Sequence, residues 1–144
     1  KPNSDTYGRK IIYIIDEYVK KNQDRACSFV SLGQLRYLST LKYVDGVVGN
    51  SSSGLLEVPT YKIGTVNIGD RQRNRLKAIS VIDCKPNEKN ILISIKKLYS
   101  KSFQKKITKT INPYGKGGSA KKIIRILKGL NYENLLIKKF NDIK

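Results

Sequence analysis

The order of apolar and polar residues predicts helices and short strands that alternate along the chain. Helical spacing of apolar residues marks the segments 10–21, 32–43, 87–98, 100–111 and 119–130. A shorter helix is expected at 55–61, with an uncertain end because Pro59 interrupts it. Short uninterrupted apolar runs predict strands at 26–30, 46–48, 65–68 and 80–82.

This alternation predicts an α/β fold, namely a Rossmann-like, doubly wound, mainly parallel sheet with helices on both faces. Short, wholly apolar strands are typical of sheets that are covered on both sides. We expect one domain over residues 1–130 and a helix or tail over 131–144. Because ligands of such folds bind beyond the carboxyl ends of the strands, the turns after 46–48 and 65–68 are expected to border one crevice.

Composition fits a single globular domain, with 144 residues of which 39% are hydrophobic. No apolar run is long enough to cross a membrane, and the start of the chain has no signal-peptide pattern. The net charge of +18 is the feature that favours a nucleic-acid-binding module. We rank that function below nucleotide binding, because lysines outnumber arginines by 22 to 7 and no run of five basic residues occurs.

Several kinds of catalytic site are excluded within this chain because it contains no histidine. Serine or cysteine machinery that relies on a histidine base is impossible here, and a zinc site would lack its usual ligands. Cys27 and Cys84 lie far apart in or near apolar segments, so we expect buried free thiols in a reducing cytoplasm, with a disulfide left open.

The segment from Val47 to Glu57 is typical of a strand, a tight turn of small polar residues and the first turn of a helix. The first amides of a helix have no partner within it, so such a turn can hold a phosphate. Ser51 and Ser52 would add hydroxyl donors, and Glu57 follows where a carboxylate can bond sugar hydroxyls. The alternative is an ordinary corner in which Ser51 or Ser52 only caps the helix.

Three further residues have both a functional and a structural interpretation. Arg71 follows the strand at 65–68, where it can bind a diphosphate or can simply be solvated. Tyr37 can stack on a base or pack in the core. Asn3 lies in a polar loop whose residues can also cap the first helix.

Together these motifs resemble the UDP-N-acetylglucosamine 2-epimerases, most closely the hydrolysing type that makes N-acetylmannosamine for sialic acid and related sugars. The serine turn reads Gly-Asn-Ser-Ser-Ser-Gly-x-x-Glu-x-Pro from Gly49, and Asn67-Ile-Gly-Asp-Arg-Gln72 and Asn112-Pro-Tyr-Gly115 follow it. Residues 31–38 and the opening Pro2-Asn3-x-Asp5 fit the same family. The resemblance covers about residues 2 to 130.

The resemblance implies a two-domain fold of the GT-B type, with this chain forming most of the C-terminal domain. Its UDP-binding residues would be Asn3, Tyr37, Ser51, Ser52, Glu57 and Arg71. Ser51 and Ser52 would contact the phosphates, Glu57 the ribose hydroxyls and Tyr37 the uracil. Arg71 would assist nucleotide binding. No metal and no cofactor are implied. The expected partners are UDP or a UDP-sugar and the N-terminal domain of the same enzyme, while a homo-oligomer is left open and neither a membrane nor a nucleic acid is expected.

The family mechanism eliminates UDP to give an unsaturated 2-acetamidoglucal, to which water then adds. The acids and bases for these steps are carboxylates of the N-terminal domain and a histidine early in the C-terminal domain. Since the chain has neither histidine nor methionine, we expect it to begin after that histidine, to contain no catalytic residue and to be inactive alone. Lys116 stands where the family usually has an acid.

Other functions remain open alternatives at this point. They are a non-hydrolysing epimerase, a diacetamido-sugar epimerase, a GT-B glycosyltransferase and, ranked lower, a basic nucleic-acid-binding module.

Overall fold

The computed structural model describes residues 8–133, which fall into two compact units. Within the described residues, the first unit comprises residues 8–113 and the second comprises residues 114–133. Most of the predicted elements are present. The first unit contains the helices α1 (Gly8–Lys21), α2 (Gly33–Thr40), α3 (Ser53–Leu56), α4 (Glu88–Leu98) and α5 (Lys101–Ile107) and the 3₁₀ helix η1 (Val58–Tyr61).

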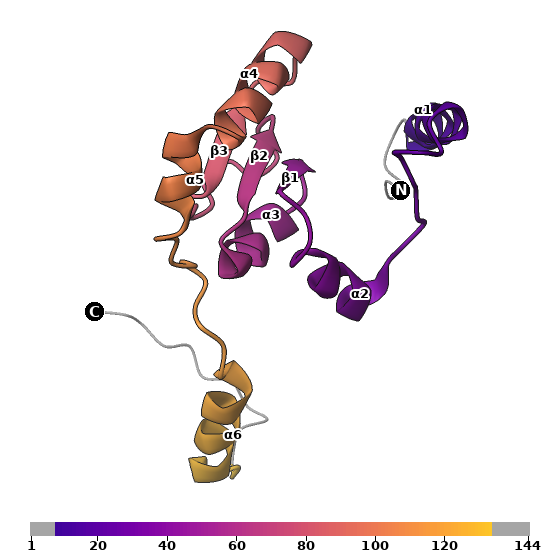
Figure 1. Cartoon of the computed structure of the whole chain (residues 1–144). Helices are drawn as coiled ribbons and strands as arrows, with labels where there is room; N and C mark the ends of the chain where they lie inside the picture. The colour runs from indigo at the N-terminus through magenta and orange to yellow at the C-terminus, as the bar shows by residue number, and fades with distance from the viewer. Residues whose placement is uncertain (1–7, 134–144) are drawn as a thin grey trace. The chain divides into compact units, whose positions relative to one another are not determined.

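A three-stranded parallel sheet organises the described part of the first unit (Figure 1). Its strands are β1 (Gly46–Gly49), β2 (Gly64–Ile68) and β3 (Val81–Cys84), and they lie side by side in chain order. Val48 is opposite Val66, and Val66 is opposite Ile82. The α/β class and the parallel sheet are therefore confirmed, while no reversal of strand order occurs among the described strands.

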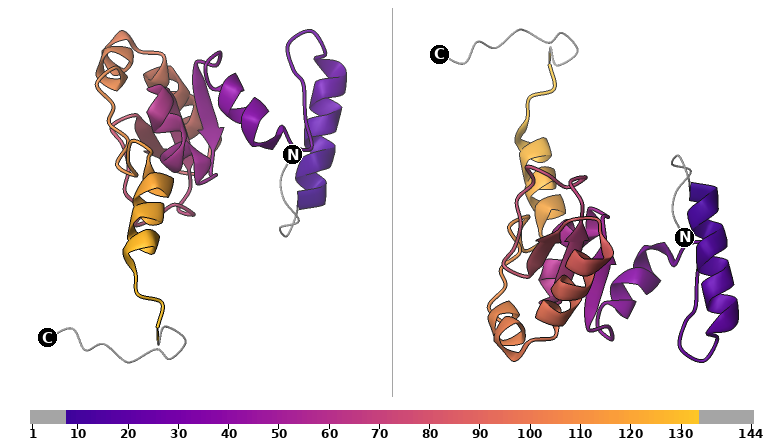
Figure 2. Two further views of the ribbon diagram at one scale, coloured as in Figure 1. Left: turned by 90° about the horizontal axis from the view of Figure 1, so that it is seen from below. Right: turned by 90° about the horizontal axis from the view of Figure 1, so that it is seen from above.

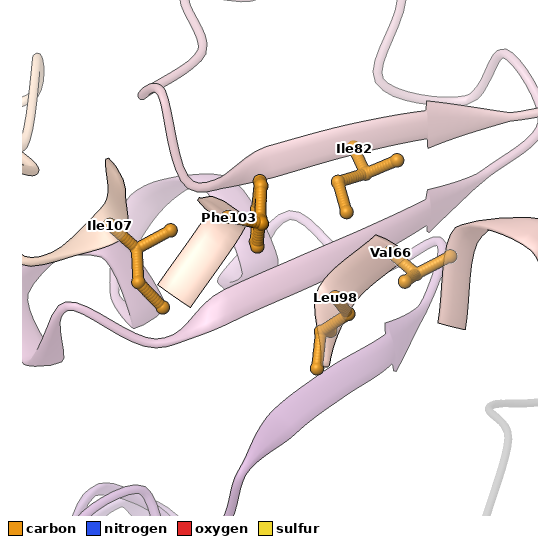
Figure 3. Close-up of a cluster of buried hydrophobic side chains, with 5 residues drawn as sticks. All are labelled: Val66, Ile82, Leu98, Phe103 and Ile107. Atoms are coloured by element: carbon orange, nitrogen blue, oxygen red, sulfur yellow. The ribbon is translucent and has the colours of Figure 1, made fainter. Parts of the chain in front are cut away.

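Helices cover both faces of the central strand β2, as the sequence predicts. On one face Val66 packs in a buried cluster with Ile82, Leu98, Phe103 and Ile107, which come from β3, α4 and α5 (Figure 3). Successive side chains of a strand point to opposite faces, so Thr65 faces the other way. There the Thr65 hydroxyl donates to the Gly54 carbonyl of α3 at 3.0 Å.

The edge strand β1 is less buried than its sequence suggests. A short apolar strand is typical of a sheet covered on both sides, but Val48 is 50% exposed. Among the described strands β1 pairs only with β2, so one of its sides is not covered by the sheet. The buried strand of this sheet is β2, which has neighbours on both sides.

The strand predicted at residues 26–30 is wrong, since these residues are irregular in the structure. A strand needs a neighbour for its backbone N–H and C=O groups, and an apolar run does not supply one. Phe29 and Val30 are instead 53% and 78% exposed. The expectation of a buried thiol also fails for Cys27, which is exposed, while Cys84 is half-buried and both are free.

Local capping explains where α4 and α5 begin. The Asn87 side chain accepts a hydrogen bond from the Asn90 amide, and the Ser100 hydroxyl accepts one from the Phe103 amide. The helix α5 ends at Ile107, four residues before the predicted end.

The second unit contains α6 (Ser119–Gly129), drawn as a single helix in Figure 2. Its N-cap is Gly118, and its first helical residue is Ser119, where the predicted segment 119–130 begins. The helix or tail expected at 131–144 lies almost entirely outside the described residues. No helix within residues 8–133 is long and apolar enough to cross a membrane.

Candidate functional site

The serine turn connects the edge strand β1 to α3, as the sequence predicts. The Ser51 hydroxyl accepts a hydrogen bond from the Ser53 amide at 3.3 Å. The amides of Gly54 and Leu55 donate to the carbonyls of Ser51 and Ser52. Since α3 is a single turn, these amides are already used within it, which differs from the expected row of free helical N–H groups. The Ser51 and Ser52 hydroxyl groups therefore become the main candidates for a phosphate contact.

A cavity of about 730 Å³ brings three of the predicted site residues together. Tyr37 on α2, Ser51 in the serine turn and Glu57 after α3 all line it. Residues 29–34 supply the rest of its wall. Glu57 and Tyr37 are half-buried, and Ser51 is exposed. The cavity thus holds a hydroxyl group, a carboxylate and an aromatic ring, which suit the sugar and base of a nucleotide.

Tyr37 also has a direct structural role. Its hydroxyl group is hydrogen-bonded to the Ser53 hydroxyl at the start of α3. The tyrosine therefore ties α2 to the serine turn, and its ring lines the cavity beside that turn. Tyr37 is half-buried and lies outside the buried cluster, so its structural role is this hydrogen bond to Ser53, and base stacking stays a prediction.

The other predicted residues lie outside the lining of this cavity. Arg71 is exposed in the turn that follows β2, and Ser52 is half-buried at the N-cap of α3. The turn of Arg71 is nevertheless tied to the serine turn, because the Nε2 atom of Gln72 donates to the Asn50 carbonyl at 2.8 Å. Asn3 lies outside the described residues.

Sequence reasoning missed the wall formed by residues 29–34. Gly33 has a φ of +67°, a conformation that glycine adopts without strain, and its amide donates to the Ser31 hydroxyl at 3.1 Å. This turn directs the chain into α2 and so carries Tyr37 to the cavity. The sequence signal for this wall is the Ser31-Leu-Gly33 motif, which belongs to the segment 31–38 that fits the family.

A second cavity of about 450 Å³ lies at the carboxyl ends of β2 and β3. Asp70, Lys85 and half-buried Cys84 are among its lining residues. Asp83, also in the lining, accepts hydrogen bonds from Lys77 and from buried Asn67, each at 2.7 Å. Burial raises the pKa of Asp83, but the hydrogen bonds from Lys77 and Asn67 and the Lys77 charge outweigh it and lower the pKa below the ordinary value. Asp83 therefore stays ionised as part of a network that joins β2 to β3.

The described residues contain no group of three or more histidine, cysteine, aspartate or glutamate side chains arranged to hold a metal ion. The residues that line the first cavity offer hydroxyl groups, a carboxylate and an aromatic ring to a ligand.

Comparison with known proteins identifies the family of this chain. The family model described as UDP-N-acetylglucosamine 2-epimerase matches residues 1–128. The chain belongs to the UDP-N-acetylglucosamine 2-epimerase family. The serine turn, Glu57 and the turn of Arg71 all lie within the matched range.

Individual relatives are similar over most or nearly all of this chain. A GDP/UDP-N,N'-diacetylbacillosamine 2-epimerase (hydrolyzing) of Campylobacter jejuni is 39% identical over 144 residues, which are 99% of this chain and 37% of that protein. The polysialic acid biosynthesis protein P7 of Escherichia coli is 38% identical over 142 residues, 97% of this chain and 34% of that protein. A UDP-N-acetylglucosamine 2-epimerase of Neisseria meningitidis is 34% identical over 99 residues, 69% of this chain and 26% of that protein. The chain thus spans about a third of the length of the first two relatives.

Proposed function

We propose that this chain binds the UDP portion of a nucleotide sugar at the first cavity. The observation that carries the proposal is the convergence of Tyr37, Ser51 and Glu57 on one cavity, although they come from three separate elements. The family resemblance assigns UDP contacts to these same three residues.

The roles follow from the chemistry of the groups. The Ser51 and Ser52 hydroxyls donate to the diphosphate, and the Glu57 carboxylate accepts from the ribose hydroxyls. The Tyr37 ring lies against the uracil. Arg71 adds positive charge from the turn after β2, and we retain Asn3 as a further contact near the nucleotide.

The reaction we propose for the complete machinery is hydrolytic 2-epimerisation of a UDP-sugar. UDP leaves the sugar and water adds to the unsaturated product, with inversion at C2. The relatives favour two substrate classes, since their names specify N-acetylglucosamine in one case and diacetylbacillosamine in another. We propose UDP-N-acetylglucosamine as the first substrate class and a UDP-diacetamido sugar as the second. The protein would be cytoplasmic, and this chain would form the nucleotide-binding, C-terminal half of a two-domain fold of the GT-B type.

The acid and base groups for this reaction are not assigned to the chain. It has no histidine, and Glu57 is committed to the ribose in the proposed complex. Catalysis would then require groups from the part of the family fold that the chain does not match. We therefore propose a binding role, and no catalytic role, for these 144 residues.

Titration of the chain with UDP, followed by the amide chemical shifts in two-dimensional NMR, tests the binding. We expect saturable shifts that concentrate at residues 51–57 and at Tyr37. The same titration with a DNA duplex at near-physiological salt tests the nucleic-acid alternative that the charge of +18 suggests. Shifts with the duplex and none with UDP would reject the proposal.

A further inference from the structure

Two side-chain amides from distant segments hold the backbone on either side of the serine turn. The Nε2 atom of Gln72 donates to the Asn50 carbonyl at 2.8 Å, just before Ser51. The Nδ2 atom of Asn112 donates to the Leu56 carbonyl at 2.8 Å, just before Glu57. These contacts join residues that are 22 and 56 positions apart in the chain.

Gln72 is an unusual residue to bury. It is only 3% exposed, and its Oε1 atom has no hydrogen-bond partner among the described residues. A buried acceptor without a partner is costly, so an apolar side chain of similar size would fill the space at less cost. The bond to the Asn50 carbonyl is what the amide adds over such a side chain.

Asn112 holds the other end of the turn by two hydrogen bonds that its one side-chain amide group donates. The same Nδ2 atom donates to the Leu56 carbonyl and to the Thr60 hydroxyl, each at 2.8 Å. Leu56 ends α3, Thr60 lies in η1, and Glu57 lies between them. Asn112 therefore fixes the bend that contains Glu57, one of the residues that line the cavity.

We propose that Gln72 and Asn112 are positioning residues for nucleotide binding, which we call the amide clamp. The inference rests on the proposed function. Gln72 holds the phosphate end of the site through Asn50 and the adjacent serines, whereas Asn112 holds the ribose end through Leu56 and Glu57. The two residues therefore affect different parts of the same ligand.

The test measures affinity for UDP and for uridine by NMR titration of the chain. Gln72→Met keeps the length of the side chain and removes its amide, and Asn112→Leu keeps the branched shape. We expect Gln72→Met to weaken UDP binding about tenfold, the effect of a misaligned charged hydrogen bond, and to leave uridine binding unchanged. Asn112→Leu is expected to weaken the binding of both ligands, because both contain the ribose.

Matched controls separate positioning from loss of stability. The Nε2 atom of Gln104 donates to the Leu98 carbonyl at 2.6 Å, and the Nδ2 atom of Asn22 donates to the Tyr18 carbonyl at 2.8 Å. Gln104→Met and Asn22→Leu therefore remove the same kind of bond outside the site. We expect them to lower the melting temperature without changing the affinity for either ligand.

The outcomes distinguish this inference from the proposal on which it rests. A wild-type chain that does not bind UDP overturns both. A wild-type chain that binds UDP, with affinity unchanged in Gln72→Met and Asn112→Leu, overturns the amide clamp alone. Equal losses for UDP and uridine in Gln72→Met also overturn the assignment of its end of the site. If Gln72→Met does not fold, Asn112→Leu carries the test, because its loss of affinity for both UDP and uridine is expected independently of Gln72.

Discussion

Gly54 lies so close to Thr65 that a side chain on the glycine would collide with the threonine methyl group. A β-carbon built on Gly54 would lie 2.6 Å from the Thr65 Cγ2 atom. The Thr65 hydroxyl meanwhile donates to the Gly54 carbonyl at 3.0 Å. Threonine thus holds α3 against β2 with its hydroxyl group and sets their separation with its methyl group.

Gly54→Ala is expected to destabilise the chain, because the added methyl group must push α3 away from β2. Overpacking of this kind costs about 1–3 kcal/mol, from which the better helix propensity of alanine recovers up to about 1 kcal/mol. Urea unfolding followed by circular dichroism measures the loss.

The control for Gly54→Ala is the double variant with Thr65→Ser, which keeps the hydroxyl group and removes the colliding methyl. We expect the double variant to regain most of the stability that Gly54→Ala loses. If the double variant is less stable than Gly54→Ala, the collision with the Thr65 methyl group is not the cause of the lost stability.

Much of the fold was predictable because its determinants are local. The apolar run before Gly69 and the helical spacing after Asn87 each specify an element without reference to the rest of the chain. The run at 26–30 has the same local character but forms no strand, because pairing depends on a neighbour that the run does not specify. The local pattern therefore shows which segments are apolar, but it does not specify which strand such a segment pairs with.

The candidate site was predictable where one short motif carries it. Ser51 and Glu57 are six residues apart, and a single turn of helix carries both to one cavity. The contribution of Gln72 was not predictable, since its partner Asn50 is fixed only by the packing of two strand-end turns. The same holds for Asn112 and Leu56.

Two substitutions of Tyr37 separate the role of its hydroxyl group from the role of its ring. Tyr37→Phe keeps the ring and loses the bond to Ser53, so we expect lower stability, by about 0.5–1.5 kcal/mol, and UDP affinity reduced less than fivefold. Tyr37→Leu also removes the ring and is expected to weaken UDP binding further, by about 0.5–1.5 kcal/mol. Calorimetric titration and thermal unfolding measure the two effects. Identical UDP affinities in the two variants would show that the ring does not contact the base.

Asp83 makes the stability of the chain dependent on pH. Its pKa is lower in the folded chain than its ordinary value of 3.8, so its contribution is present above that value and is lost as the pH falls through the folded pKa. We expect wild type to be more stable than Asp83→Asn at pH 6, with the difference shrinking below pH 4. Asp45→Asn, which removes the same charge from an exposed bend, is the control and should not reproduce this trend. A difference that stays constant from pH 6 to pH 3 would contradict the role of the Asp83 charge.

The 144 residues alone are expected to release neither UDP nor N-acetylmannosamine from UDP-N-acetylglucosamine. The reason is that the acid and base groups of the proposed reaction are not assigned to them. Incubation with the sugar nucleotide, followed by chromatography of the nucleotides, measures turnover, and a full-length relative serves as the positive control. Release of UDP by the chain above the uncatalysed rate would show that it carries its own catalytic groups.

Glu57→Ala and Arg71→Ala are each expected to weaken UDP binding by about 1–3 kcal/mol, the cost of losing a charged hydrogen-bond partner. The two losses differ in their origin, because Glu57 is proposed to bind the ribose and Arg71 to add charge near the phosphates. Raising the salt concentration should therefore reduce the effect of Arg71→Ala, which acts from an exposed turn, more than that of Glu57→Ala in the cavity.

Arg75→Ala removes the same charge from the same turn and is the control for Arg71→Ala, with little expected effect. Calorimetric titration with UDP at two salt concentrations measures all three variants. Unchanged UDP affinity in both Glu57→Ala and Arg71→Ala would reject the site. If Arg75→Ala weakens UDP binding as much as Arg71→Ala does, Arg71 has no specific role beyond its positive charge.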